Sequence, residues 1–335
     1  MTGTLTHSEH PTARLLVRDI QDETPEHRIA LSYVGVTGTQ RMVHLTTGGT
    51  AHQTMLARID AGASLSAGRR GAHMSRFHEA IDAACLGVPA HPLLVAARMA
   101  AGIAERQDSG HACTTFSGDL LLDDTSPVSV RRCHVPALIE VGAASCNGTW
   151  RGIISVSVAG MNACPCAQEL VRDSSMDRLL KAGYDETEAQ RILALVPGAT
   201  HNQRGTATLT LGYTWNGAWE DAPAALAIAD QVSLARASMG TEIHELLKRG
   251  DEHAVVLASH ERPRFVEDCT RELISLCAAD TRLADETHAW ARQINHESIH
   301  AHDVETSAHA LLGDLRAERG TSRNPDPRSW MRAVE

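Results

Sequence analysis

Cysteine, histidine and carboxylate side chains recur in short polar motifs in the second half of the chain, and the first of these motifs is built on two cysteines. Asn162-Ala-Cys164-Pro-Cys166-Ala-Gln168 ends a segment in which apolar and polar residues alternate as in a strand. At a strand end a side chain can face a cleft, and a thiolate there is both a nucleophile and a soft metal ligand. Two buried structural cysteines are the alternative, because the spacing is not the CxxC of zinc ribbons.

Two further motifs supply histidines. Thr200-His201-Asn202-Gln203-Arg204 comes directly before a strand-like segment, and His296-Glu297-Ser298-Ile299-His300-Ala301-His302-Asp303 combines three histidines with two acids. If the second motif is helical, Glu297 and His300 share a face. If it is extended, His300 and His302 share a face instead. Both motifs suit a loop at a functional site, and a solvated surface loop is the alternative for both.

Three more motifs have a plain structural reading beside a functional one. Lys248-Arg249-Gly250-Asp251-Glu252 follows a helix-like stretch and can be a helix cap, although Glu252 is also a possible oxygen ligand. Arg262-Pro-Arg264-Phe-Val-Glu267-Asp268 begins a helix, where acids in the first turn are ordinarily stabilising. Gly71-Ala-His73-Met-Ser75-Arg76-Phe77 suits a phosphate-binding loop, or equally a helix start with Ser75 as its cap.

Composition limits the class of protein that carries these motifs. Of the 335 residues 43% are apolar, which is enough for one large or two modest packed domains. Aromatic residues make up only 3%, so the core must rest on Ala, Leu, Val and Ile. The net charge of −10 argues against nucleic acid as a partner. Without a signal-like or membrane-spanning run we expect a cytoplasmic protein with no membrane partner, whose 8 cysteines are reduced.

The elements that must position the motifs follow from the hydrophobic pattern. Alternation predicts strands at 28–35 and 40–47, joined by a turn at VTGT, and at 54–60, 110–122, 131–145, 151–163 and 205–214. Helices are predicted at 76–87, 92–106, 167–195, 222–249 and 263–280, while 286–296 and 303–312 suit either state. Each half thus reads strand pair, helix pair, strand pair, which favours an α+β fold over a doubly wound sheet.

This repeat divides the chain into four predicted parts. A polar segment over 1–25 with two prolines indicates a mobile N-terminal arm. We expect a first unit over 26–148 and a second over 149–312, the latter with a helical insert at 167–197. The charged residues 313–335 predict a solvated polar tail.

Taken in order, the motifs resemble those of the type IB GTP cyclohydrolases. The shared motifs are HMSRF (73–77), CPC (164–166), HNQR (201–204), LKRGDE (247–252), PRFVED (263–268) and ESIHAHD (297–303), and the resemblance covers about residues 25–310. ACPCAQ followed by a long helical insert before ATHNQRG is similar to the archaeal-type branch. The bacterial pattern has Ser-Lys after the second cysteine and a shorter path to the histidine, whereas here Gln168 stands at the Lys position.

The resemblance implies a fold and a reaction. The family has the tunnelling fold, in which antiparallel strands carry a pair of helices on one face, and each chain holds two such units in tandem. Chains assemble as homotetramers that pair sheets into barrels, with active sites at subunit interfaces. The family's enzymes open the guanine ring of GTP at C8, release formate and reclose the product as a 7,8-dihydroneopterin phosphate, either a triphosphate or a 2′,3′-cyclic phosphate.

The resemblance also implies roles for single residues. By motif match, one divalent metal, Fe(II), Mn(II) or Zn(II), is expected on Cys164, His201, Glu252 and His300. The expected catalytic residues are Cys164, His201 and His300, with the histidines as proton carriers and Cys164 as either ligand or direct catalyst. The guanine edge is expected on Glu267 or, as second choice, Glu297, and the triphosphate on His73, Arg76 and Arg204. Cys166 is assigned a structural role.

Two departures from the family pattern keep other functions open. Ala301 stands where the family commonly has Asn between two histidines, and the residues after Asp303 also differ. One alternative is a tunnelling-fold relative that acts on another purine or pterin. The other is a purine-binding paralogue without turnover, against which the retained Cys, His and Glu residues argue.

Overall fold

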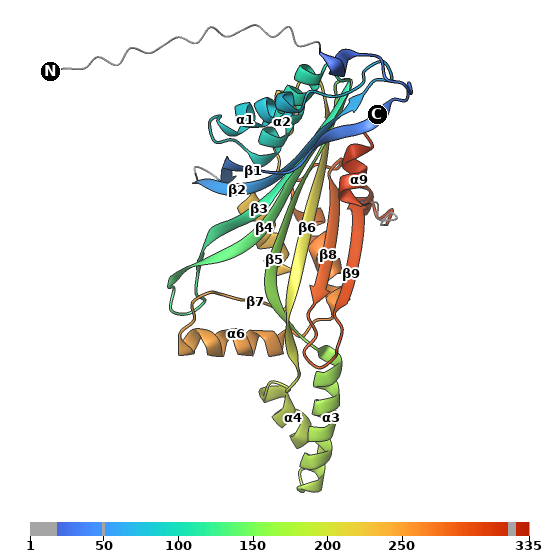
Figure 1. Cartoon of the computed structure of the whole chain (residues 1–335). Helices are drawn as coiled ribbons and strands as arrows, with labels where there is room; N and C mark the ends of the chain where they lie inside the picture. The colour runs from blue at the N-terminus through green and yellow to red at the C-terminus, as the bar shows by residue number, and fades with distance from the viewer. Residues whose placement is uncertain (1–18, 49–50, 321–325, 335) are drawn as a thin grey trace, which may run out of the picture.

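The computed structural model describes residues 19–48, 51–320 and 326–334, and most of the predicted N-terminal arm therefore lies outside the described residues. The described part forms a long, strongly twisted antiparallel sheet with helices packed along it (Figure 1). The strand order is β1-β2-β3-β4-β5-β6-β8-β9, and a short β7 pairs with β5. No helix within these ranges is long and apolar enough to cross a membrane.

The first set of elements consists of four long strands with a helix pair between the second and third. These elements are β1 (Leu31–Gly48), β2 (Ala51–Leu65), α1 (Met74–Cys85), α2 (Pro92–Gln107), β3 (His111–Thr125) and β4 (Arg132–Cys146), after a short 3-10 helix η1 (Ile20–Asp22). Pro92 occupies the first turn of α2, where its missing N–H leaves no hydrogen bond unmade.

The second set repeats this order with additions. Its strands are β5 (Thr149–Ala163), β6 (Asn202–Asn216), β7 (Thr241–Glu242), β8 (His288–Asn295) and β9 (Val304–Leu311). Its helices are α3 (Pro165–Lys181), α4 (Glu186–Leu195), η2 (Trp219–Asp221), α5 (Ile228–Ala237), α6 (Arg249–Glu261), α7 (Val266–Ala279), α8 (Leu312–Arg316) and α9 (Pro327–Arg332). The α3–α4 hairpin projects from the end of the sheet (Figure 1).

A tight hairpin joins the two sets into one sheet. Asn147 and Gly148 both have positive φ, at 48° and 85°, as a two-residue Asn-Gly turn requires. The pairing of β4 with β5 runs from Cys146↔Thr149 to Ala137↔Val158 without a break in register. The predicted α+β fold, two tandem units of antiparallel strands with paired helices on one face, is confirmed, and this is the tunnelling-fold arrangement.

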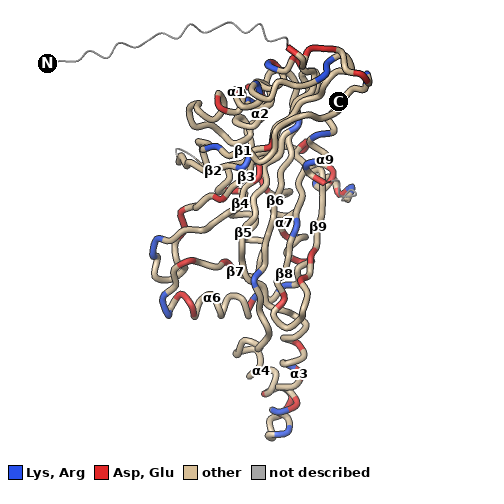
Figure 2. The backbone as a smooth tube through the Cα atoms, viewed as in Figure 1, with Lys and Arg blue, Asp and Glu red and all other residues tan. Residues whose placement is uncertain are grey.

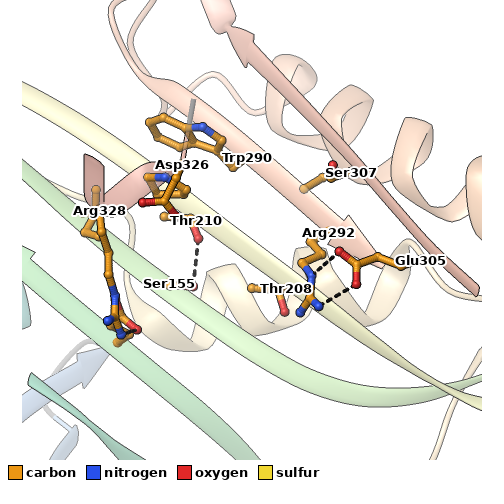
Figure 3. A pocket seen from close by; sticks show the side chains of 13 residues that line it. Ser155, Thr208, Thr210, Trp290, Arg292, Glu305, Ser307, Asp326 and Arg328 are labelled. Atoms are coloured by element: carbon orange, nitrogen blue, oxygen red, sulfur yellow. Dashed lines mark hydrogen bonds and ion pairs between the residues drawn. The ribbon is translucent and has the colours of Figure 1, made fainter. Parts of the chain in front are cut away.

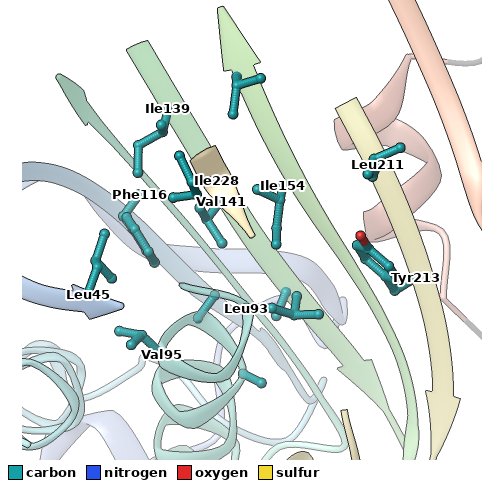
Figure 4. Close-up of a cluster of buried hydrophobic side chains, with 14 of the residues drawn as sticks. Leu45, Leu93, Val95, Phe116, Ile139, Val141, Ile154, Leu211, Tyr213 and Ile228 are labelled. Atoms are coloured by element: carbon teal, nitrogen blue, oxygen red, sulfur yellow. The ribbon is translucent and has the colours of Figure 1, made fainter. Parts of the chain in front are cut away.

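One hydrophobic core fills the space between the sheet and the helices and continues from the first set of elements into the second (Figure 4). It is built mainly from aliphatic residues and alanines, as the low aromatic content predicted. Members drawn in Figure 4 are Leu45, Leu93, Val95, Phe116, Ile139, Val141, Ile154, Leu211, Tyr213 and Ile228. The two units therefore share a single buried interior.

The opposite face of the sheet carries α9. Successive strand residues point to opposite faces, so Ile154 belongs to the main core while Ile153 packs with Met331 and Val334 in a separate cluster. Arg151 donates from its guanidinium to the backbone oxygens of Trp330 and Ala333, at 2.9 and 3.1 Å. The prediction of a solvated tail over 313–335 is therefore wrong for α9, because this helix has an apolar side that the charge count obscured.

Beside α9 the same face is hollowed into a cavity of about 490 Å³ (Figure 3). Hydroxyl groups of β5 and β6 line its floor, and Trp290 and the Arg292–Glu305 ion pair line the side formed by β8 and β9. Both N–H···O contacts of that ion pair measure 2.7 Å. Arg328 of α9 reaches Glu140 of β4 in a second ion pair.

Two predicted boundaries are wrong for identifiable reasons. No turn separates 28–35 from 40–47, because β1 runs through the VTGT segment with an irregularity between Val36 and Thr39, and Gly38 takes a φ of 70° there. The helix predicted at 222–249 is only α5, because the chain must then pass close to β5. A side chain at Gly240 would lie 3.0 Å from the backbone oxygen of Met161. The two ambiguous segments, 286–296 and 303–312, contain the strands β8 and β9.

Candidate active site

Cys164 and His201 lie next to each other although 37 positions separate them in the sequence. The pairing of β5 with β6 ends at Ala163↔Asn202, so the residues just beyond it meet. The Cys164 N–H donates to the His201 backbone oxygen at 3.1 Å, and the Thr200 hydroxyl donates to the Cys164 backbone oxygen at 2.7 Å. The whole α3–α4 hairpin is thus an excursion that leaves and re-enters the sheet at one place.

The Cys164 sulfur sits at the amino-terminal end of α3. It is the N-cap residue, with Pro165 in the first turn, and its Sγ accepts the Ala167 N–H at 3.5 Å. The unpaired N–H groups and the dipole of a helix start favour negative charge at this point. Cys166 is exposed, whereas Cys164 is half-buried.

A series of side-chain hydrogen bonds through Gln203 connects His201 to Glu297 and orients its ring. Its Nδ1 lies 3.0 Å from Gln203 Oε1 and 3.4 Å from the Ser298 hydroxyl. Gln203 Nε2 donates to Glu297 Oε1 at 3.3 Å, so the amide must turn its oxygen toward the histidine. An amide oxygen only accepts, which makes Nδ1 the donor and leaves Nε2 with a free lone pair.

The segment between β8 and β9 brings the remaining histidines to the same place. The His296 N–H donates to the Arg204 backbone oxygen at 2.9 Å, and His296 Nδ1 lies 2.9 Å from Asp303 Oδ2, which closes the loop on itself. His300 and His302 stack with ring centroids 5.4 Å apart. His296 is therefore a structural residue of this loop, while the stacked pair faces the site.

These groups line one cavity of about 230 Å³. Among the residues predicted for the site, it brings together Cys164, His201, Glu267, Glu297 and His300. The other lining residues are Gln203, Arg264, Phe265, Val266, Asn295, His302 and Val304. Ligand pockets usually measure about 300–1,000 Å³, so a nucleotide needs more room than this chain alone provides.

A buried amide network forms the base of the site. Asn162, at the end of β5, donates to Asn295 Oδ1 at 2.7 Å and accepts from the Gly240 N–H at 2.8 Å. The Cys269 thiol also donates to Asn162 Oδ1, at 3.3 Å. Burial raises the pKa of Cys269 to about 12, so it remains a protonated donor at neutral pH. The network ties β5, β8 and α7 together directly beneath Cys164.

Arg264 fixes the approach of α7 to the site. Its N–H donates to the Ala163 backbone oxygen at 2.9 Å, and its guanidinium donates to the Ser238 backbone oxygen at 3.2 Å. Glu267 lies in the first turn of α7 and is exposed, and it makes no hydrogen bond or ion pair with any residue that the structure describes. Both of its carboxylate oxygens are thus available to a ligand.

Four predicted site residues lie outside this cavity. Glu252 is exposed on α6 and lines a different cavity of about 510 Å³, and Arg204 lines a third cavity of about 330 Å³. His73 faces two carboxylates, with its Nε2 at 3.6 Å from Asp19 and 3.7 Å from Asp22, and Arg76 donates to the Arg106 backbone oxygen. The helices α1 and α3, the second of which has Cys164 as its N-cap, lie toward opposite ends of the sheet (Figure 1).

The motif around Glu252 has a structural role through its neighbour Asp251. The buried Asp251 carboxylate accepts the Lys248 N–H at the start of α6, and also the Val128 and Ser129 N–H groups, each at 2.8 Å. Burial opposes its ionisation, but these bonds and the Ser129 hydroxyl together hold the pKa of Asp251 well below its usual range. The motif does cap a helix, but it caps the start of α6 through the Asp251 carboxylate and not, as predicted, the end of a preceding helix through its cations.

The donor set of the small cavity fits the expected metal by chemistry. A thiolate sulfur with two imidazoles suits a borderline divalent metal such as Fe(II) or Zn(II). Within the described ranges, however, the groups of three or more donors lying within 4.8 Å of one another are Asp124–Cys133–His244 and Asp19–Asp22–His73. Cys164, His201 and His300 thus share a cavity in this chain, and Glu252 does not join them there.

The sequence did not assign seven of the lining residues to the site, and three of them show why. Gln203 lies two positions after His201, and alternation along a strand places such residues on one face, which was a usable signal. His302 belongs to the motif already singled out, and its stacking on His300 was foreseeable only for an extended chain. Arg264 belongs to the motif that begins α7, but its place in the site depends on the contact with Ala163, which the motif does not reveal.

Comparison with known proteins gives the class to which this fold and site belong. Residues 17–306 match the family model "Type I GTP cyclohydrolase folE2". The chain therefore belongs to this family, and the prediction of a GTP cyclohydrolase is confirmed at that level.

The chain can also be compared with individual members of the family and with solved structures. The chain is similar to "GTP cyclohydrolase MptA" of Methanothermobacter thermautotrophicus, with 34% identity over 90% of this chain and 95% of that protein. The protein of the same name from Methanosphaera stadtmanae is 33% identical over 90% of this chain and 97% of that protein. Among solved structures, uricase from Arthrobacter globiformis covers 90% of this chain and 98% of its own at 7% identity, with a TM-score of 0.48.

Proposed function

We propose that this chain is a GTP cyclohydrolase of the type IB class, archaeal-type branch, which opens the guanine ring of GTP by hydrolysis at C8. C8 leaves as formate, and the product recloses as a 7,8-dihydroneopterin phosphate, with the 2′,3′-cyclic phosphate favoured over the triphosphate. The observation that carries the proposal is the single cavity shared by Cys164, His201, His300, Glu267 and Glu297. The similarity to the archaeal proteins supports the choice of branch.

Guanine recognition is assigned to Glu267. Its carboxylate is exposed at the start of α7, and two acceptor oxygens match the N1–H and N2–H2 donors of the guanine edge. Glu297 is the second choice, because one of its oxygens already accepts the Gln203 amide. Exchange of Glu267 for Gln would turn one acceptor into a donor facing N1–H or N2–H2.

One divalent metal, Fe(II), Mn(II) or Zn(II), is proposed on Cys164, His201 and His300, with Glu252 as a fourth ligand. When bound, such a metal supplies a hydroxide by lowering the pKa of its water to about 7. The chain's own groups then hold and move protons. Gln203 keeps the His201 proton on Nδ1, so Nε2 is free to bind the metal or to accept a proton. His300 is exposed at the cavity and is the second proton carrier.

A homotetramer is proposed because one chain leaves the site incomplete. Glu252, His73 and Arg76 lie away from the small cavity in the same chain and can reach such a site from another copy. Among the described residues β1 and β9 are the edge strands of the sheet, with β1 making one further bridge at Leu45↔Ala90, and pairing between chains would cover both edges. Light scattering should then report about four times 36.0 kDa, and a 36.0 kDa species would contradict the shared site.

The decisive experiment is a turnover assay under anaerobic conditions. We expect the protein to be cytoplasmic. The purified chain is loaded with Fe(II), Mn(II) or Zn(II) and given GTP. Formate and the fluorescent pterin that forms on oxidation of the product are then measured. Cys164→Ala should abolish both products, whereas Cys166→Ala, the matched control at an exposed thiol, should retain them. Absence of formate with every metal would refute the proposal. Turnover of another purine in place of GTP would support the broader alternative of a relative with a different substrate.

A further inference from the structure

A second cluster of metal-binding side chains lies where β3, β4 and the segment after β7 meet. Asp124 and Cys133 are directly paired across β3 and β4, and they therefore project from the same face of the sheet. His244 follows β7 by two residues and lies over this pair. One ligand atom from each of the three side chains lies within 4.8 Å of the other two.

These separations suit a common metal ion. Zinc binds sulfur at about 2.3 Å, histidine nitrogen at about 2.0–2.1 Å and carboxylate oxygen at about 2.0–2.2 Å. Two ligand atoms on opposite sides of one ion can thus be about 4 Å apart, and small side-chain rotations close the remaining difference. The three residues come from three separate elements, so the geometry is held by the fold and not by one flexible loop.

The cluster is buried and already hydrogen-bonded as a ligand set would be. Only 12% of the Asp124 side chain and 6% of the His244 side chain are exposed, and Cys133 is buried. His244 Nδ1 lies 2.9 Å from Asp124 Oδ2. Burial and the neighbouring Asp124 carboxylate raise the pKa of the Cys133 thiol, and the backbone N–H of Leu246 only partly offsets them, so this sulfur keeps its proton until a cation takes its place.

Charge around the cluster also favours a divalent cation. Arg236 forms ion pairs with Asp124 at 3.1 Å and with Glu242 at 2.8 Å, so its positive charge is shared between two carboxylates. With Cys133 as a thiolate, the negative groups are Asp124, Glu242 and Cys133, and the positive group is Arg236. Their net charge is −2, which a divalent metal neutralises. An ion-pair network of Asp124, Arg236 and His244 explains two of the three donors, but it gives no role to a buried sulfur beside them.

We propose that Asp124, Cys133 and His244 bind one zinc-class divalent metal ion, separate from the site at Cys164. On binding, the Cys133 S–H bond breaks, its proton leaves to solvent, and the sulfur–metal bond forms in its place. His244 also lines the cavity of about 330 Å³ that contains Arg204 and Glu245, so a fourth coordination position can open toward it. Three protein ligands and an open position are the arrangement of a site that holds a water or a small anion.

The test uses cobalt as the probe and removes the other thiolate site first. Metal-free Cys164→Ser protein is titrated with Co(II), whose sulfur-to-metal charge-transfer absorption reports a thiolate ligand. We expect one equivalent per chain to produce this band, and Zn(II) to displace it. The band should be lost when Cys133→Ser is added and weakened when His244→Ala is added. Cys146→Ser is the matched control, because Cys146 lies at the other end of β4, and it should leave the band unchanged.

Each outcome of this titration either supports or overturns the metal site at Asp124, Cys133 and His244. If Cys164→Ser protein takes up no cobalt, or keeps the band after Cys133→Ser, the proposed site does not exist. If Cys133→Ser fails to fold, X-ray absorption of the cobalt-loaded Cys164→Ser protein replaces it, and one sulfur ligand is expected where none would overturn the proposal. Formate release does not enter this test, so the result is independent of the function proposed above.

Discussion

At the scale of single residues, Gln203 is the side chain on which the site's proton placement depends. Its amide is buried and spans two groups, accepting from His201 Nδ1 and donating to the carboxylate of Glu297. Groups that hold a metal-ligating histidine in one tautomer typically change activity or metal affinity by about 10–100-fold when removed. Gln203 is accordingly a positioning residue for His201.

Gln203→Leu should therefore lower formate release by about 10–100-fold and weaken metal binding, since the His201 ring loses the contact that fixes its proton. The measurement is kcat together with metal affinity and the pH profile of kcat. Asn202→Ala is the control, because its side chain points to the other face of β6. An unchanged pH profile in Gln203→Leu would show that the amide does not orient the histidine.

His288 provides a residue-scale prediction about acid stability. Burial, with the neighbouring His309 and the Arg151 guanidinium, lowers the pKa of His288 to about 4. An unfolded histidine has a pKa of about 6.5, so between these values the unfolded chain binds the extra proton. Stability must fall as pH drops through that window. In His288→Gln the unfolding free energy should decline less between pH 7 and pH 4.5, while the exposed His52→Gln should follow the natural chain.

At the scale of elements, most strands and helices could be predicted from the sequence. The predicted boundaries were wrong where long-range contacts determine where an element ends. The strands around Cys164 and His201 were predicted because their alternation is strong and local. A turn at VTGT was predicted between two alternating segments, but pairing with β2 carries β1 through it. The 222–249 helix ends early because β7 pairs with β5, which the local pattern does not encode.

The same limit applies to the candidate site. Cys164, His201 and His300 could be found from their motifs, because the residue types themselves carry the chemistry. Their convergence could not be derived from spacing, since it follows from the pairing of β5 with β6 and of β6 with β8. Asn162 and Arg264 stand inside motifs found in the sequence, but their contacts depend on how distant segments pack, so the motifs did not reveal what these two side chains do.

The docking of α9 gives an element-scale prediction. Met331 is completely buried against the open face of the sheet. Met331→Ala should lower the unfolding free energy by about 2–5 kcal/mol, the usual cost of truncating a buried methionine. Chemical denaturation measures this difference. Ser329→Ala, at an exposed position of the same helix, should stay within about 0.5 kcal/mol of the natural chain. Equal effects of the two changes would mean that α9 is not packed in solution.

At the scale of the whole molecule, the two units are joined too extensively to behave as separate domains. They share a continuous ladder between β4 and β5 and one hydrophobic core. Asp251 of α6 adds a link to the loop between β3 and β4 through two backbone N–H groups. Positive and negative side chains are interspersed along both units (Figure 2), so neither unit presents a large surface of one charge sign that would repel the other unit.

Calorimetry should accordingly show a single unfolding transition for the full chain, because neither unit can lose the shared interior alone. Coincidence of far-UV and tryptophan signals during unfolding provides the check. Asp251→Ala should lower the midpoint while keeping one transition. Two resolved transitions in the natural chain would show that the units 26–148 and 149–312 are independent.

The α3–α4 hairpin has a consequence for how this protein can be modified. Its two ends are neighbours in space, held by the hydrogen bond from Cys164 to His201, and near its base Gln168 of α3 also donates to the His260 backbone oxygen of α6 at 2.8 Å, so the part of the hairpin beyond these contacts can change in length without moving the sheet. Chain can be added or exchanged there as in a surface loop, provided the new segment begins and ends at adjacent points. A fluorescent reporter whose termini lie close together could be inserted at the tip between α3 and α4. It would lie a few helical turns from Cys164 and His201 and report on their surroundings without displacing either side chain.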